Sequence, residues 1–388
     1  MTQKFKLIGQ GFDTVQVSFQ TRIPETLADQ IYEAQWQAKQ TRKPEPVTIG
    51  PGHVKGEVLR HGGGGGDAIF STGDLGEMWF LKLDQKRDKW GATIKVRSLA
   101  LLCYGFEEAL SHLWEHANGM RLEVDGYSLG RIDYRFDVLT CRSFAPLESS
   151  VVRHNRTVVR PYEIMNRKHP IWEWNDDPDV RVILRGKLIE TLMIGTIGSG
   201  MQIVIYNKRS ELTLTRNHVV PERYGLDPND PSWGLWRVEV RFAGDVLKRR
   251  LNVRDLVSLR ANLRSILTRA LTRVRYIRPR QDHLPAAQQL LHPLWEIVTE
   301  AIAGATCEQP SQFAPERAEY LIRQERERSL KANVAGCSLS LAAMHTSDSL
   351  EVAKLAPQLA CQAVEDALVI DPRRASRAID RAWNHRVR

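Results

Sequence analysis

Three segments of the chain alternate apolar and polar residues with the period of two that is typical of strands lying over a core. These segments are Met201–Lys208, Arg131–Val138 and Trp236–Phe242. The first is a β-branched run entered from a glycine-rich turn, and its alternation places Tyr206 and Lys208 on one face. A tyrosine at the end of a buried strand with a lysine two residues on is a candidate nucleophile with a phosphate clamp. A packed strand tyrosine is the commoner interpretation of this segment alone.

The other two strands carry charged residues along one face. These residues are Arg131, Asp133, Arg135 and Asp137 on one strand and Arg237, Glu239 and Arg241 on the other. For either strand alone, a solvent-facing surface with salt bridges is the ordinary interpretation. Aspartate is depleted in strands, however, so two on one face need a reason. If the three strands are neighbours, their carboxylates can bind a divalent metal and present a phosphodiester to a tyrosyl oxygen.

The remaining pattern predicts an α+β protein with a largely antiparallel sheet domain that carries the active site, followed by a helical C-terminal region. Further strands are expected at Phe12–Phe19, Trp79–Leu83 and Thr93–Arg97, and helices at 24–43, 106–118, 314–333, 335–344 and 350–368. The glycine run at 62–66 is expected to be a flexible hairpin tip. We expect a strand-rich catalytic domain over 1–247, a basic helical segment over 248–304 packed on it, and a helical region over 305–388.

The segment from Lys248 to Arg280 is strongly basic. It contains ten arginines and one lysine against Asp255 alone. Its apolar residues recur at helical spacing and predict a core-facing stripe, while Arg260, Arg264 and Arg269 lie off that stripe. A solvated arginine-rich face is the plain alternative, but the scarcity of acidic residues favours a surface that binds nucleic acid.

Residues 142–189 are expected to form a loop or insertion, with Trp172 and Trp174 in a small satellite core or stacked on unpaired bases.

The composition is that of an ordinary soluble protein, and a net charge of +9 with a pI near 9.4 favours a polyanionic partner. Five scattered cysteines argue against a disulfide framework and a cysteine zinc site. The sequence opens without a signal peptide and has no long apolar run, so we expect a cytoplasmic protein without a membrane partner.

Several motifs together resemble the trans-acting replication initiation factors of rolling-circle plasmids and phages, with related relaxases of conjugative elements. They stand in the family's order across about residues 10–300. The motifs are Phe12–Phe19, Leu129–Val138, Glu190–Gly195 leading into Ile205–Lys208, and Trp236–Arg241. The chain departs from the family at Ile197 and Val204, where members often carry basic residues.

The resemblance implies a DNA strand-nicking and joining endonuclease that starts replication at an origin. It assigns Tyr206 as the nucleophile, and Asp133, Asp137 and Glu239 as metal ligands. Lys208 would stabilise the phenolate, and Arg135, Arg237 and Arg241 would contact DNA. Since no histidine pair of the His-x-His type occurs, a metal on carboxylates would be magnesium or manganese. The expected partner is origin DNA, with a host helicase and a second copy of the chain as further candidates.

Three alternatives stay open at this stage. A relaxase of a conjugative element would use the same chemistry. A DNA-binding regulator would use the same fold without cleavage. A zinc hydrolase would use His112 and His116, which stand in a His-x-x-Glu-His pattern on a predicted helix but lack an identified third ligand.

Overall fold

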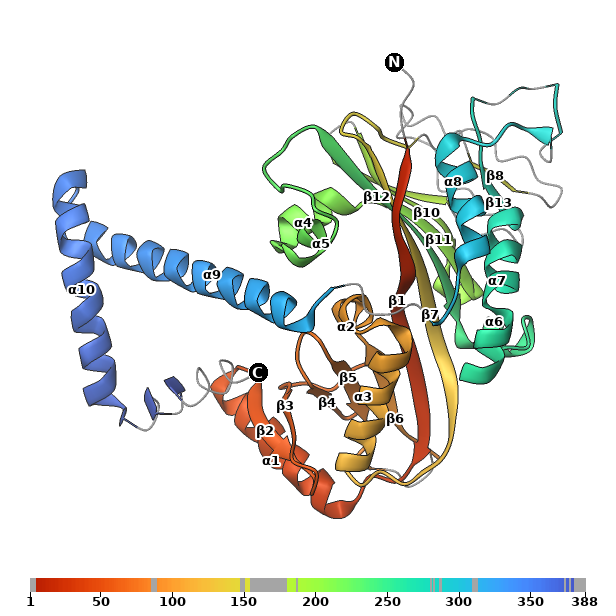
Figure 1. Cartoon of the computed structure of the whole chain (residues 1–388). Coiled ribbons are helices and arrows are strands. Elements are labelled where there is room, and N and C mark those ends of the chain that lie inside the picture. Colours follow the sequence, from red (N-terminus) through yellow and green to blue (C-terminus); the bar gives the residue numbers. More distant parts are fainter. Residues whose placement is uncertain are drawn as a thin grey trace, which may run out of the picture. The chain divides into compact units, whose positions relative to one another are not determined.

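An 11-stranded antiparallel sheet forms the centre of the protein in the computed structural model (Figure 1). The structure describes residues 5–84, 89–146, 151–153, 180–185, 188–279, 281, 283–285, 288–308, 313–372, 375–376 and 378–379. The strand order is β2-β3-β4-β5-β6-β1-β7-β12-β11-β10-β9, and β13 pairs with β8 in a separate two-stranded sheet. With the helices that follow, this sheet confirms the α+β prediction.

The strands are β1 (Lys6–Thr21), β2 (Glu45–Ile49), β3 (Val54–Val58), β4 (Ala68–Ser71), β5 (Glu77–Leu81), β6 (Trp90–Val96), β7 (Val124–Cys141), β8 (Val151–Arg153), β9 (Val180–Arg185), β10 (Leu188–Thr196), β11 (Met201–Asn207), β12 (Trp233–Ala243) and β13 (Val274–Tyr276). The helices are α1 (Glu25–Thr41), α2 (Ser98–Cys103), α3 (Gly105–Gly119), α4 (Lys208–Thr215), α5 (Val219–Arg223), α6 (Gly244–Arg249), α7 (Leu256–Arg273), α8 (Pro293–Ala301), α9 (Pro315–Ala343) and α10 (Ser349–Ile370).

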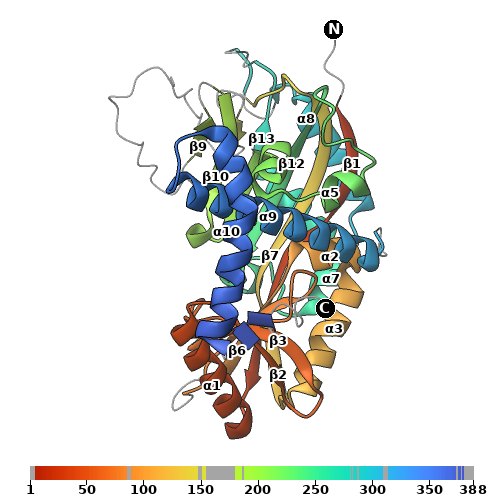
Figure 2. The same ribbon diagram turned by 90° about the vertical axis from the view of Figure 1, so that its left-hand side faces the viewer.

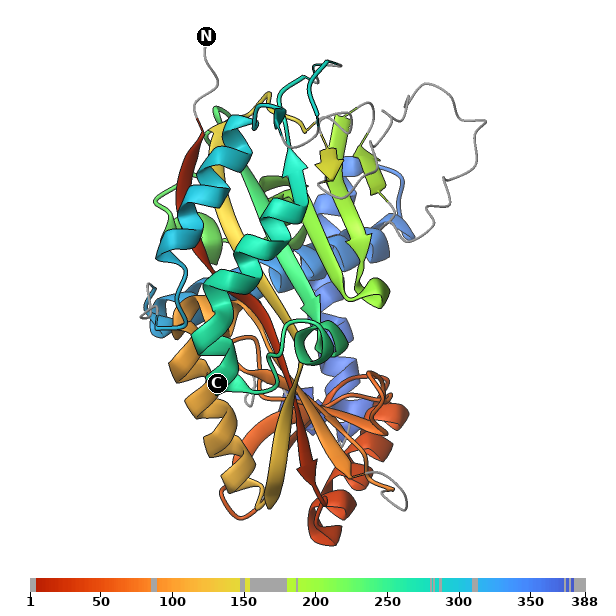
Figure 3. The same ribbon diagram turned by 90° about the vertical axis from the view of Figure 1, so that its right-hand side faces the viewer.

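The two faces of the central strands are covered by different helices. The apolar face of β7, β11 and β12 packs with α7 and α8 into one hydrophobic core, in which Trp236, Leu267 and Trp295 are almost fully buried. Figure 3 shows α7 and α8, in teal, lying across the strands. The polar face carries α4 and α5, seen from their side in Figure 2. The apolar residues of these alternating strands therefore face the core, and their polar residues face the candidate site.

Most of the expected elements are present. The stripe from Leu256 to Val274 is buried, which confirms the helix predicted in the basic segment. The glycine run connects β3 to β4 as the predicted hairpin turn, with Gly64 and Gly65 at positive φ. The predicted strand ending at Lys208 stops at Asn207, because the Asn207 side chain accepts a hydrogen bond from the Ser210 backbone N–H and begins α4. Trp172 and Trp174 lie outside the described residues.

The chain separates into two compact units, Met1–Ala314 and Pro315–Arg388. The basic segment over 248–304 belongs to the first unit, together with all the strands. The second unit contains α9 and α10. No helix in the described part of the chain is long and apolar enough to cross a membrane.

Candidate functional site

The three strands singled out in the sequence are direct neighbours, in the order β7-β12-β11. Their register pairs Asp137 with Arg237, Arg135 with Glu239, Asp133 with Arg241, and Tyr206 with Arg237. Directly opposed residues on neighbouring strands point to the same face. The structure thus brings the predicted tyrosine, carboxylates and strand arginines onto one face of the sheet.

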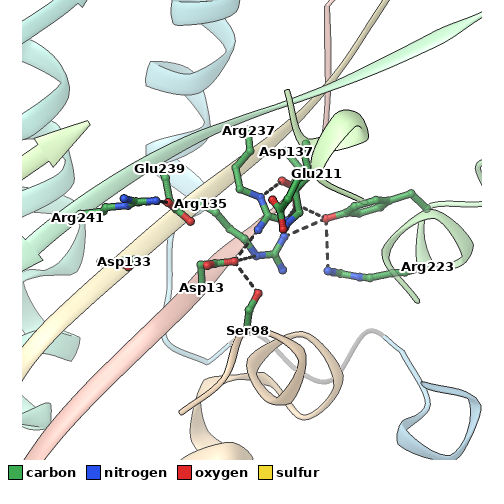
Figure 4. Close-up of polar contacts among 12 residues, drawn as sticks. Asp13, Ser98, Asp133, Arg135, Asp137, Glu211, Arg223, Arg237, Glu239 and Arg241 are labelled. Carbon is green, nitrogen blue, oxygen red and sulfur yellow. Dashed lines mark hydrogen bonds and ion pairs between the residues drawn. The ribbon is translucent and has the colours of Figure 1, made fainter. Parts of the chain in front are cut away.

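Asp137 is the centre of this face and is fully buried. Arg237 Nε donates to Asp137 Oδ1 at 2.6 Å and Arg237 Nη2 donates to Oδ2 at 3.1 Å, a bidentate pairing (Figure 4). Arg135 Nη1 also donates to Oδ2. Both arginines are themselves buried, so the carboxylate and two guanidinium groups stabilise one another away from water.

Asp13 is a site residue that the sequence reasoning missed. It accepts hydrogen bonds at Oδ1 from Arg237 Nη1 and from the Ser98 hydroxyl, each at 2.6 Å. Strict alternation would place Asp13 on the same face as Val15, in the core. A β-bulge between Phe12 and Thr14 breaks that alternation and turns the aspartate toward Arg237. The available signal was an aspartate, a residue depleted in strands, inside the predicted strand Phe12–Phe19.

Tyr224, directly after α5, completes the contacts around Asp137. Its hydroxyl donates to Asp137 Oδ2 at 2.6 Å and accepts from Arg135 Nη1 at 3.1 Å. A Cβ at Gly9, on β1 opposite Asp137, would lie only 2.2 Å from the Tyr224 oxygen. Because Gly9 has no side chain, the Tyr224 hydroxyl can reach Asp137 and Arg135.

The charges in the cluster move the pKa values of its carboxyls in opposite directions. Burial raises the pKa of Asp137, but Arg237 and Arg135 outweigh it and hold that pKa well below its usual range. Asp13 is held low in the same way, chiefly by Arg237. For Glu239, burial and the neighbouring Asp13 outweigh its pairing with Arg241 and raise the pKa to about 8.

Glu239 provides a stability prediction. A carboxyl whose pKa rises from 4.5 to about 8 on folding contributes fully below pH 4.5, and its contribution is lost as the pH rises toward 8. As the pH rises from 4.5 to 8, the free energy of unfolding should fall less steeply in the Glu239→Gln variant than in the wild type. The two slopes should differ by at most about 1.4 kcal/mol per pH unit. Thermal unfolding from about pH 5 to about pH 9 measures this. Parallel profiles for the two proteins would contradict the assignment.

The other two predicted metal ligands are also paired with arginines. Arg131 holds Asp133 through two hydrogen bonds of 2.8 and 2.7 Å. Arg241 Nε donates to Glu239 Oε2 at 2.7 Å, and Arg241 Nη1 donates to Gln202 at 3.1 Å. Each carboxylate that the sequence offers to a metal therefore has a guanidinium partner.

This arrangement does not fit a divalent ion. No group of three or more His, Cys, Asp or Glu side chains able to hold a metal occurs within the described residues. The two oxygens of Asp137 already accept from Arg237, Arg135 and Tyr224. A magnesium or manganese requirement therefore stays a prediction from the sequence.

Tyr206 lies beside buried cations at the end of β11. Burial raises the pKa of its phenol well above 10, and the positive charge of Arg237 opposes that rise. Lys208 begins α4 and its Nζ lies over the Tyr206 ring, 5.7 Å from the centroid. Lys208 is buried and donates to both oxygens of Glu211, at 2.8 and 2.7 Å, while burial and Arg237 lower its pKa. The predicted pair of tyrosine and lysine is adjacent, although the lysine belongs to the helix.

The arginines of α7 are not brought to this site. Arg260 and Arg264 are exposed, and they contact Glu107 and the carbonyl of Ala305. Arg269 is exposed as well. Figure 3 shows α7 on the apolar face of the strands. Tyr206 is paired with Arg237 on the polar face, so these arginines lie on the other side of the sheet from it. Any DNA contact they make is separate from the Asp137 cluster.

The two histidines of the His-x-x-Glu-His pattern have other partners. His116 Nδ1 lies 2.9 Å from Glu77 Oε2, and the His112 ring packs edge-on against Tyr104. Both lie on α3, which packs against β1 and β6. No metal-holding group that includes them is found in the described part of the chain.

Comparisons with known proteins do not place the chain in a family. No family model matches the chain, and no curated protein sequence matches it. Among solved structures, the chain is similar to a rolling circle replication initiator protein from Geobacillus stearothermophilus, with 11% identity and a TM-score of 0.37. That similarity covers 79% of this chain and 100% of the other. At this TM-score the similarity does not establish a function for the chain.

Proposed function

We propose that the protein is a DNA strand-nicking and joining enzyme that starts rolling-circle replication at an origin, with Tyr206 as its nucleophile. The observation that carries the proposal is the position of Tyr206, directly opposite Arg237 and beside Lys208 on a charged sheet face. A strand tyrosine packed only for stability does not need two buried cations around it. The sequence motifs, in their order along the chain, support the same function.

In the proposed reaction, the Tyr206 hydroxyl gives up its proton and its oxygen attacks a phosphorus of one DNA strand. The bond between that phosphorus and the 3′ oxygen breaks, and the 3′ oxygen takes up a proton. Tyr206 becomes linked to the 5′ phosphate, and the free 3′ hydroxyl primes synthesis. Rejoining reverses these steps and frees the tyrosine.

The cations have distinct tasks in this scheme. A phenol with a raised pKa is a weak nucleophile, so the phenolate that forms must be stabilised as DNA binds. Arg237 already opposes the rise in pKa, and it is fixed in position by Asp13 and Asp137. The side chains of Lys208 and Arg241 are 8% and 24% exposed, compared with 1% for Arg237, and they would contact the phosphate, whose negative charge grows in the transition state.

A second function, a DNA-binding regulator without cleavage, is favoured by one specific observation. The carboxylates that would hold a metal are all paired with arginines, and burial raises the pKa of the Tyr206 phenol well above 10. Such a site could be structural only. A relaxase of a conjugative element would share the cleavage chemistry and differ in its DNA target.

The experiment that separates these functions is incubation of the purified protein with supercoiled DNA of its own replicon. We expect nicked circles and a protein-linked strand, since both follow from attack by Tyr206. Parallel reactions with magnesium, manganese or a chelator test the metal requirement directly. Binding without nicking under every condition would favour the regulator.

The basic face of α7 gives a prediction about DNA affinity. Each phosphate that the protein neutralises on duplex DNA contributes about −0.9 to the slope of log K against log salt. Changing Arg260, Arg264 and Arg269 together to alanine should flatten that slope by up to about three units. Arg22→Gln, at an exposed position on the connection between β1 and α1, is the control and should leave the slope unchanged. An unchanged slope in the triple variant would restrict these arginines to the contacts they make within the protein.

A further inference from the structure

The polar face of the sheet continues beyond Tyr206 onto β10 and β9, and β9 forms the edge of the sheet (Figure 2). The register places Thr191 of β10 directly opposite Tyr206, and Ile183 of β9 directly opposite Thr191. Because directly opposed residues share a face, all three side chains lie on the polar face. Neighbouring strands are about 4.8 Å apart, so Ile183 lies about 10 Å across the sheet from Tyr206.

The polar face is closed on one side of Tyr206 and open on the other. On the side of β12 and β7, Arg237 and Asp137 are almost fully buried, and the Tyr224 hydroxyl contacts Asp137. On the side of β10 and β9, Ile183 is 48% exposed. The open approach to Tyr206 therefore lies over β10 and β9.

Arg185, the last residue of β9, contributes an exposed cation to this open side. Its side chain is 63% exposed. Its Nη1 donates to the Ser210 hydroxyl at 2.7 Å and lies 3.5 Å from Glu190 Oε1. Ser210 belongs to the first turn of α4, so these contacts hold Arg185 on the side of the sheet that carries Tyr206. An ion pair this exposed contributes little free energy, so a phosphate can replace Glu190 as the partner.

Apolar side chains lie beside the cations on this part of the face. Arg181, Ile183 and Arg185 alternate along β9 and share the polar face, and Leu188, opposite Arg185, is 66% exposed. The arginines suit backbone phosphates, and the apolar side chains offer a surface against which the face of a base can pack. Double-stranded DNA hides the faces of its bases in the stack, so the apolar side chains favour an unpaired strand.

We propose that the outer face, formed by Arg181, Ile183, Arg185 and Leu188, binds the unpaired DNA strand next to the phosphate that is attacked. Arg185 contacts a backbone phosphate and Ile183 packs against a base. The proposal rests on the proposed function, because its ligand is the strand that Tyr206 attacks. Holding that strand on β9 aligns the neighbouring phosphate with the tyrosine before the reaction.

The test measures binding of a fluorescent single-stranded oligonucleotide without an origin sequence, by anisotropy over a range of salt concentrations. Every variant is made in the Tyr206→Phe protein, so that no strand is cleaved. Arg185→Gln removes the exposed charge, and Arg22→Gln on an exposed loop is its matched control. Ile183→Glu places a carboxylate on the outer face. Its matched control is Leu330→Glu on α9, where the leucine is 58% exposed.

We expect Arg185→Gln to weaken binding about fivefold at low salt and to flatten the slope of log K against log salt by about 0.7, the contribution of one phosphate on single-stranded DNA. Ile183→Glu should weaken binding about tenfold, because its carboxylate repels the phosphates and the apolar contact is lost. The proposal is overturned if both variants bind like their controls. It is also overturned if an unlabelled duplex of the same sequence competes as well as the unlabelled single strand.

Adduct formation on origin DNA, by the protein that retains Tyr206, is scored separately. Adducts together with unaffected oligonucleotide binding in both variants would disprove the outer face alone. Weakened binding in both variants, with no adduct from the protein that retains Tyr206, would disprove the nicking function alone.

Discussion

Tyr206→Phe is expected to abolish strand cleavage while the protein still folds and binds DNA. Phenylalanine keeps the ring and removes only the hydroxyl, so the packing of β11 is preserved. Loss of the attacking oxygen should lower the nicking rate by about 10⁴-fold or more, as for other residues that form the covalent intermediate. Nicked circles on agarose gels, measured over time, give this rate.

Tyr224→Phe is the matched control for that variant. Tyr224 also lies in the site, but its hydroxyl donates to Asp137 at 2.6 Å and is held over Gly9. Its loss should reduce the free energy of unfolding by about 2 kcal/mol, because a hydrogen bond to a charged group is removed, and nicking should persist. If Tyr224→Phe stops nicking and Tyr206→Phe does not, the nucleophile has been assigned to the wrong tyrosine.

Asp137→Asn should destabilise the protein strongly. Asp137 is fully buried between Arg237 and Arg135, and asparagine leaves those two guanidinium groups without their shared counter-charge. Breaking a buried ion pair on one side costs about 3–5 kcal/mol of unfolding free energy. Urea unfolding measures it, and Asp245→Asn on the exposed side of α6 is the control.

The same variant bears on the metal question. If Asp137 serves mainly as a ligand for magnesium, the asparagine variant should unfold like the wild type in a chelator and lose only nicking. If it serves as the counter-charge of two arginines, stability falls whether or not metal is present. The hydrogen bonds around Asp137 favour the second result.

The sequence was sufficient for the parts of the fold that depend on alternation. The charged faces of β7 and β12 and the apolar stripe of α7 follow from periods of two and 3.6 residues, and the structure contains all three. Alternation also says which residues share a face. It cannot say which charged side chain pairs with which, because that depends on strand register.

Asp13 and Tyr224 are site residues whose positions cannot be predicted from alternation. The bulge in β1 shifts Asp13 off the face that alternation assigns to it, and bulges leave no reliable pattern in a single sequence. Tyr224 reaches Asp137 from a segment far along the chain, through space left by Gly9. The pairing of each predicted metal ligand with an arginine likewise required the register of β7 against β12.

Peptide mapping of the covalent adduct tests the central claim most directly. The protein is incubated with origin DNA, denatured and digested with protease and nuclease, and the nucleotide-bearing peptide is sequenced by mass spectrometry. We expect the nucleotide on Tyr206, in the peptide that contains Met201–Asn207. Recovery of the nucleotide on Tyr224 or any other residue would contradict the account, as would the absence of any adduct under conditions in which the protein binds the same DNA.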